Sequence, residues 1–119
     1  MIDPASSNGP AIQSDFAGDP DMGELVELFL QELPERMKVS TEAWTAGDLK
    51  IVQRVAHQLR GSSAGYGFPS LGLVAGEVED TIRTPQPPLT SPTPELEAVY
   101  GRFRSIAARV MAGAARKAA

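Results

Sequence analysis

The stretch DLKIVQRVAHQLRGSSAGYGFP, residues 48–69, contains the start, the apolar face and the end of one helix. Asp48 is a typical N-cap residue, because its side chain can accept a hydrogen bond from an amide of the first turn. Apolar and small residues follow at helical spacing, at Leu49, Val52, Val55, Ala56, Leu59 and Ser63. Gly65, Gly67 and Pro69 end the helix. This helix needs partners that cover its apolar face.

The segment before it supplies one such partner. From about Asp21 onward, Leu25, Phe29, Leu33 and Met37 recur every four residues, and Val26 and Leu28 widen the stripe. Pro34 interrupts this pattern, since proline inside a helix removes one hydrogen bond and clashes with the preceding turn. We therefore expect either a kink at Pro34 or a second helix that starts there and continues through Trp44. Gly47 then ends this region.

Two further helices are predicted after residue 69. Ser70 is a candidate N-cap, with inward positions at Leu71, Val74, Ala75, Val78 and Ile82. Residues 83–94 contain five prolines and predict an extended connection. Thr93 caps the last helix, whose apolar positions are Leu96, Val99, Phe103, Ile106 and Val110. The sequence thus predicts an all-α fold, an antiparallel four-helix bundle.

Composition defines the domain and the class of protein. Residues 1–14 are polar and rich in Ser, Pro and Gly, which predicts a disordered leader or linker. We expect the bundle to occupy residues 15–113 and a basic tail, residues 114–119, to fray. The chain has no cysteine, no secretory signal and no run long enough to span a membrane, so we expect a cytoplasmic protein that does not bind membranes.

Charge is distributed unevenly. The net charge of −4 argues against a nucleic acid partner. Residues 1–48 carry ten acidic and two basic residues, whereas residues 49–119 carry nine basic and five acidic residues. The sign changes where the helix of residues 48–69 begins. An anionic partner is therefore expected on that side.

His57 is the only histidine of the chain. On a helical wheel of about 100° per residue, it lies well over a quarter turn away from Val52, Ala56 and Leu59. It should therefore point toward solvent rather than into the core. Its neighbours on the same face include Lys50, Gln53, Arg54, Arg60, Gly61 and Ala64.

These neighbours suit phosphoryl chemistry. An unperturbed imidazole is largely neutral at neutral pH, so its bare nitrogen is a nucleophile that needs no second base. Arg60 offers a planar, permanently charged group to the equatorial oxygens of a phosphoryl group. Gly61 costs about 1 kcal/mol in a helix relative to alanine, but it lets a large partner approach the ring closely.

The motif AHQLRGSSAGYG (residues 56–67), followed by LGLVAGEVE (residues 71–79), resembles the histidine-containing phosphotransfer (HPt) domain of two-component phosphorelays. The upstream ELVELFLQELPERM, together with AGDLKIVQRVAHQL, is similar to the first helical hairpin of that family. The matching positions are His57, Leu59, Arg60, Gly61, Ser62, Ser63, Gly67, Leu71, Val74, Ala75, Val78 and Glu79. Arg60 replaces the usual lysine, and the proline-rich connection is longer than the family requires.

The resemblance implies a phosphocarrier rather than an enzyme with its own ATP-dependent kinase activity. His57 would accept a phosphoryl group from a receiver-domain aspartate and pass it to another, with Arg60 stabilising the phosphate and Gly61 giving access. Partners would be response-regulator receiver domains or a hybrid histidine kinase, docking over Lys50, Gln53, Arg54, Ala64 and Gly67. No cofactor or metal of its own is implied, because the receiver brings Mg²⁺. We expect a monomer.

Two alternatives remain open at this stage. One is a degenerate HPt-like module that docks receivers without phosphotransfer, although the retained His57 argues against it. The other is the phosphoacceptor domain of a sensor kinase. Such domains resemble His-Glu-apolar-basic-Thr/Asn-Pro at their histidine, whereas this chain has His57-Gln58-Leu59-Arg60-Gly61-Ser62 and no ATP-binding domain after it.

Overall fold

The computed structural model describes the backbone of residues 9–118 and the side chains of residues 9–114. This part of the chain is all-α, as predicted, and contains no strand. Its helices are α1 (Gly23–Ala46), α2 (Leu49–Ser62), the short 3₁₀ helix η1 (Ala64–Tyr66), α3 (Pro69–Arg83) and α4 (Pro94–Ala118). None of these helices is both long and apolar enough to cross a bilayer.

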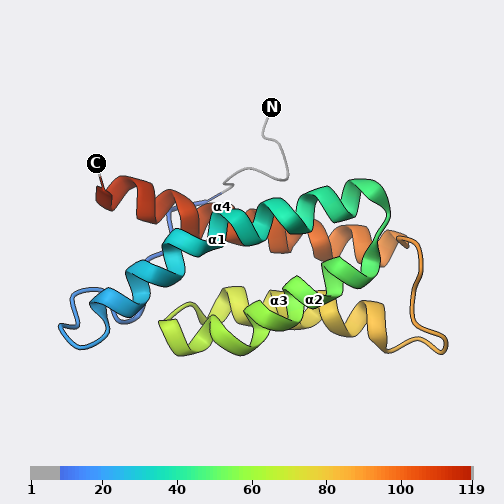
Figure 1. Cartoon of the computed structure of the whole chain (residues 1–119), viewed down its shortest axis with the longest axis horizontal. Helices are drawn as coiled ribbons and strands as arrows, with labels where there is room; N and C mark the ends of the chain where they lie inside the picture. Colours follow the sequence, from blue (N-terminus) through green and yellow to red (C-terminus); the bar gives the residue numbers. More distant parts are fainter. Residues whose placement is uncertain (1–8, 119) are drawn as a thin grey trace.

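The four α-helices form a closed ring of neighbours. α1 packs against α2 and α4, and α3 packs against the same two helices. Successive helices run in opposite directions along the long axis of the molecule (Figure 1). The predicted antiparallel four-helix bundle is therefore confirmed, and a single chain supplies all four helices.

Pro34 lies inside α1, which is continuous from Gly23 to Ala46. Figure 1 shows the axis of α1 changing direction in the middle of the helix. A proline within a helix is an identifiable cause of such a bend, because one backbone hydrogen bond is missing there. Of the two predicted possibilities, the kink is confirmed and a separate helix starting at Pro34 is wrong.

Most of the helices begin or end at the capping residues that the sequence predicted. Gly47 adopts the left-handed conformation after α1, with φ of 77°. Asp48 then caps α2 by accepting a hydrogen bond from the Ile51 amide at 3.3 Å. Thr93 accepts one from the Leu96 amide at 3.1 Å at the start of α4. The predicted N-cap at Ser70 is wrong: α3 begins one residue earlier, at Pro69, whose ring fixes φ at a helical value.

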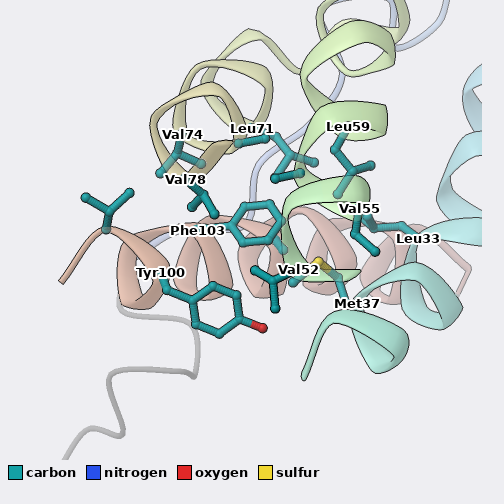
Figure 2. Packing of buried hydrophobic residues seen from close by; sticks show 14 of the residues in the cluster. Leu33, Met37, Val52, Val55, Leu59, Leu71, Val74, Val78, Tyr100 and Phe103 are labelled. Carbon is teal, nitrogen blue, oxygen red and sulfur yellow. The ribbon is translucent and has the colours of Figure 1, made fainter. Parts of the chain in front are cut away.

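The core lies between the four helices, and side chains from each helix point toward one another there (Figure 2). Its fully buried residues include Leu33, Val52, Leu59, Leu71 and Phe103. The predicted stripe of α1 needs one correction, because Leu25 and Leu28 are 46% and 53% exposed. The buried stripe instead runs through Val26, Phe29, Leu33 and Met37.

The N-terminal segment differs from its prediction. Residues 1–8 lie outside the described residues, but residues 9–14 pack on the bundle rather than forming a disordered leader. The Ile12 amide donates to the Arg109 carbonyl at 3.0 Å, and the buried Ser14 hydroxyl donates to the Tyr66 carbonyl at 2.7 Å. These hydrogen bonds tie the segment to α4 and η1.

The backbone of the C-terminal segment also differs from its prediction. We expected residues 114–119 to fray, but α4 continues as a helix to Ala118. Ala119 lies outside the described residues.

Candidate functional site

α2 presents His57 at the surface of the bundle. The helix buries Leu49, Val52, Val55, Ala56 and Leu59, all on one face. The His57 side chain lies off this face and is 68% exposed. The predicted outward orientation is therefore confirmed, and the position of the histidine follows directly from the apolar spacing of α2.

The imidazole of His57 contacts the side chain of Glu79, which lies on α3. Its Nδ1 atom lies 2.8 Å from Oε2 of Glu79, whose side chain is only 2% exposed. An ionised carboxylate can only accept hydrogen bonds, so Nδ1 carries the proton and donates it. In the neutral ring with this tautomer, Nε2 is unprotonated and has a free lone pair. A hydrogen bond of this kind fixes both the tautomer and the ring orientation.

Sequence reasoning missed this role of Glu79, which entered only as part of the family motif. A signal was present. Glu79 lies four residues after Ala75 and eight after Leu71, so it shares the inward face of α3. A buried carboxylate requires partners that compensate its charge. The sequence therefore indicated a buried acid, although it did not show which basic groups faced it.

Two arginines compensate the charge of Glu79. Nη1 of Arg60 donates to Oε1 at 3.2 Å and also to Oδ1 of Asp80 at 2.9 Å. Nη1 of Arg83, one turn along α3, lies 3.5 Å from Oε2. The hydrogen bond to Asp80, followed by that to Glu79, raises the pKa of Arg60 above its ordinary value. Arg60 is therefore permanently charged and is held against α3.

The glycines near the site have different roles. A Cβ atom added at Gly61 would meet nothing within 4 Å, so the bare surface there faces open space. This agrees with the predicted role of Gly61 in access, which itself stays a prediction. At Gly76 of α3, an added Cβ would lie 3.1 Å from Nε of Arg60. Gly76 therefore makes room for the Arg60 side chain, and the sequence analysis did not identify it.

Three of the predicted docking residues gather beside His57. Lys50, Gln53 and Arg54 line a shallow depression together with His57, Glu79 and Arg83. We call this depression the basic hollow. Ala64 is exposed on η1, seven residues after His57. Whether partners touch these residues stays a prediction.

Gly67 does not belong to this group, and its assignment to the docking surface is wrong. It is buried, has a φ of 88° and ends η1. The Asp15 amide donates to its carbonyl at 2.8 Å, and a Cβ added there would collide with the hydroxyl oxygen of Ser14. Gly67 is required for this turn and for the close approach of the N-terminal segment, which covers it.

The site thus combines an exposed imidazole, a buried carboxylate within hydrogen-bond distance of it and several basic side chains around them. The family model for the Hpt domain matches residues 24–113, which is most of the chain. Comparisons with curated proteins and with solved structures gave no match. The matched region includes all of α2 and α3, all but the first residue of α1, most of α4 and every residue of the site. The chain therefore belongs to the Hpt domain family, whose members are phosphotransfer modules of two-component relays.

Proposed function

We propose that this chain is a phosphorelay intermediate in which Nε2 of His57 carries the phosphoryl group between receiver-domain aspartates. The observation that carries this proposal is the 2.8 Å contact between Nδ1 of His57 and the buried Glu79 carboxylate. It supports a ring whose proton is on Nδ1 and whose lone pair on Nε2 is accessible from solvent. This is the form that can attack phosphorus without a further base.

The transfer step follows from this tautomer. The Nε2 lone pair forms the new N–P bond while the bond between phosphorus and the aspartyl oxygen breaks, and the electron pair stays on the departing carboxylate. No proton has to leave Nε2, because the proton is already on Nδ1. The imidazole becomes positively charged, and its Nδ1–H group continues to donate to Glu79. The carboxylate therefore stabilises charge that develops during transfer.

The reverse step uses the same contact. When a receiver aspartate attacks the phosphorus, the N–P bond breaks and the electron pair returns to Nε2. A ring that keeps its proton on Nδ1 leaves as neutral imidazole, which is a better leaving group than an imidazolate anion. Glu79 thus favours transfer in both directions, as a carrier requires.

We propose response-regulator receiver domains as the partners, or those of a hybrid histidine kinase, with the receiver supplying Mg²⁺. The basic hollow complements the acidic pocket expected of such a partner. All four helices come from one chain, so this site needs no second copy. This supports a monomeric carrier over the phosphoacceptor domain of a dimeric sensor kinase. We further propose that it has no ATP-dependent kinase activity of its own.

The direct test is incubation of the chain with a panel of ³²P-labelled phosphorylated receivers. We expect acid-labile, base-stable label on the chain from at least one receiver. Adding EDTA should block this transfer, because the receiver needs its Mg²⁺. It should leave labelling by phosphoramidate, a small donor that reacts with histidine directly, unchanged. A folded chain that binds receivers but takes label from none of these donors would support the docking-module alternative instead.

A further inference from the structure

The cations around His57 fall into two groups with different surroundings. Arg60 is held by two carboxylates of α3, at 3.2 Å from Glu79 and 2.9 Å from Asp80. Its guanidinium also lies against Gly76, where an added Cβ would come within 3.4 Å of Nε, Cδ and Cζ. The Arg60 side chain therefore lies across α3, and its Nη1 atom already donates to two carboxylates.

The second group surrounds the basic hollow. Lys50 and Arg54 form no ion pair with any side chain of residues 9–114. Arg83 reaches Glu79 only at 3.5 Å, and its side chain is 58% exposed. His57 itself lines the basic hollow, whereas Arg60 does not. The cations that share a depression with the nucleophile are therefore the ones with the fewest existing partners.

We propose that Lys50 and Arg54 form the binding site for the phosphoryl group in the basic hollow, and that Arg60 is a positioning residue that holds Glu79. This inference rests on the proposed function, and it differs from the sequence-based prediction that Arg60 contacts the phosphate. The ligand class is a phosphoryl dianion, either covalently bound to His57 or free as inorganic phosphate.

Arg60, Lys50 and Arg54 differ in the ion pairs that each would have to break in order to bind the phosphoryl group. If Arg60 moved away, the buried Glu79 carboxylate would keep only the longer, 3.5 Å contact to Arg83, and breaking a buried ion pair is strongly unfavourable. Lys50 and Arg54 have no such partner to lose among the side chains that the structure describes. Their hydrogen bonds to a phosphoryl group would be charge-assisted, which makes them shorter and stronger than neutral ones. The phosphoryl group is therefore stabilised most readily from the basic hollow.

The test compares three variants of the full chain with the wild type. Lys50→Gln/Arg54→Gln removes two cations from the basic hollow. Lys38→Gln/Arg102→Gln removes the same charge from exposed positions of α1 and α4 and serves as the matched control. Arg60→Gln removes the positioning residue.

The first measurement is titration with inorganic phosphate, followed in ¹H–¹⁵N NMR spectra. In the wild type we expect saturable shifts centred on the basic hollow. The affinity should fall about fivefold in Lys50→Gln/Arg54→Gln and stay within about twofold of the wild type in the control. Arg60→Gln should keep most of the phosphate affinity. Its effect should instead appear in the ¹⁵N shifts of the His57 ring, because Glu79 is then held less firmly.

The second measurement is the rate of labelling by phosphoramidate. We expect the Lys50→Gln/Arg54→Gln rate to fall and to lose most of its dependence on salt concentration. The inference is overturned if Arg60→Gln abolishes phosphate binding while Lys50→Gln/Arg54→Gln retains it, or if the control loses as much affinity as the hollow variant. Phosphate binding in the basic hollow without any labelling of His57 would contradict the proposed function while leaving the binding site intact.

Discussion

The two flanks of His57 on α2 look alike in sequence but differ in the structure. Toward the C-terminal end, Arg60 is tied to Glu79 and Asp80 of α3. Toward the N-terminal end, Lys50 and Arg54 line the basic hollow, and neither pairs with a carboxylate among the side chains of residues 9–114. The difference shows that the role of a surface cation depends on what the neighbouring helix places opposite it. We infer that one flank orients the nucleophile and that the other receives its phosphoryl group.

The largest expected effect comes from removing the nucleophile that both flanks serve. His57→Gln should abolish acid-labile labelling by phosphoramidate and by phosphorylated receivers. The side chain is 68% exposed, so the free energy of unfolding should change by no more than about 0.5 kcal/mol. Circular dichroism and thermal unfolding check the fold. Label that persists in a folded His57→Gln protein would place the acceptor on another residue.

The next effect separates the charge of Glu79 from its hydrogen bond. In Glu79→Ala, Nδ1 of His57 loses its acceptor, and a hydrogen bond to a charged group contributes about 1.5–3 kcal/mol. The phosphoramidate labelling rate at pH 7 should therefore fall by about tenfold to a hundredfold. Glu79→Gln keeps an oxygen acceptor without the charge and should give an intermediate rate. Wild-type rates in both variants would show that Glu79 does not orient the ring.

A smaller effect is expected at Gly61, where it should depend on the size of the donor. Gly61→Ala adds a methyl group into open space. Labelling by phosphoramidate should stay within about twofold, whereas transfer from a phosphorylated receiver should fall about tenfold, because only the large partner needs the bare surface. Gly→Ala in a helix should also raise the free energy of unfolding by about 0.4–1 kcal/mol.

Gly101→Ala in α4 is the matched control, since an added Cβ there also meets nothing within 4 Å. It should show the gain in stability without the loss in transfer. Equal rates of transfer from the receiver in Gly61→Ala and in the wild type would contradict the proposed role of Gly61 in access.

The smallest effect concerns the support of Arg60. Gly76→Ala would place a Cβ 3.1 Å from Nε of Arg60, which has to shift by a few tenths of an ångström. Such a shift weakens the hydrogen bond to Glu79 without breaking it, so the labelling rate should fall about twofold. Gly72→Ala, where the nearest atoms lie at an ordinary 3.6 Å, is the control and should label at the wild-type rate. A reversed order of the two variants would contradict this role of Gly76.

Most of the fold could be predicted from the sequence because its determinants are local. The apolar spacing of α2 and the caps at Asp48 and Thr93 each act within a few residues. The same spacing placed His57 on the outer surface. The exposure of Leu28 could not be predicted equally well, because it lies beside a buried stripe whose edges depend on how α1 kinks and packs.

The contacts of the site were harder to predict because they join distant residues. His57 and Glu79 are 22 positions apart, and they meet only because α2 and α3 pack side by side. Gly67 was assigned to the docking surface from its place in the motif. The residues that cover it, Ser14 and Asp15, lie about 50 positions earlier, and Ser14 ends a segment whose composition predicted disorder. No local pattern contains that contact.

The proposed mechanism depends most on which ring nitrogen of His57 reacts. The chain can be phosphorylated with phosphoramidate after ¹⁵N labelling, and the ring nitrogen bonded to phosphorus can be identified from its ¹⁵N–³¹P coupling. We predict phosphorus on Nε2 and a proton on Nδ1 that donates to Glu79. Phosphorus on Nδ1 would contradict the orientation that Glu79 imposes, and with it the proposed mechanism.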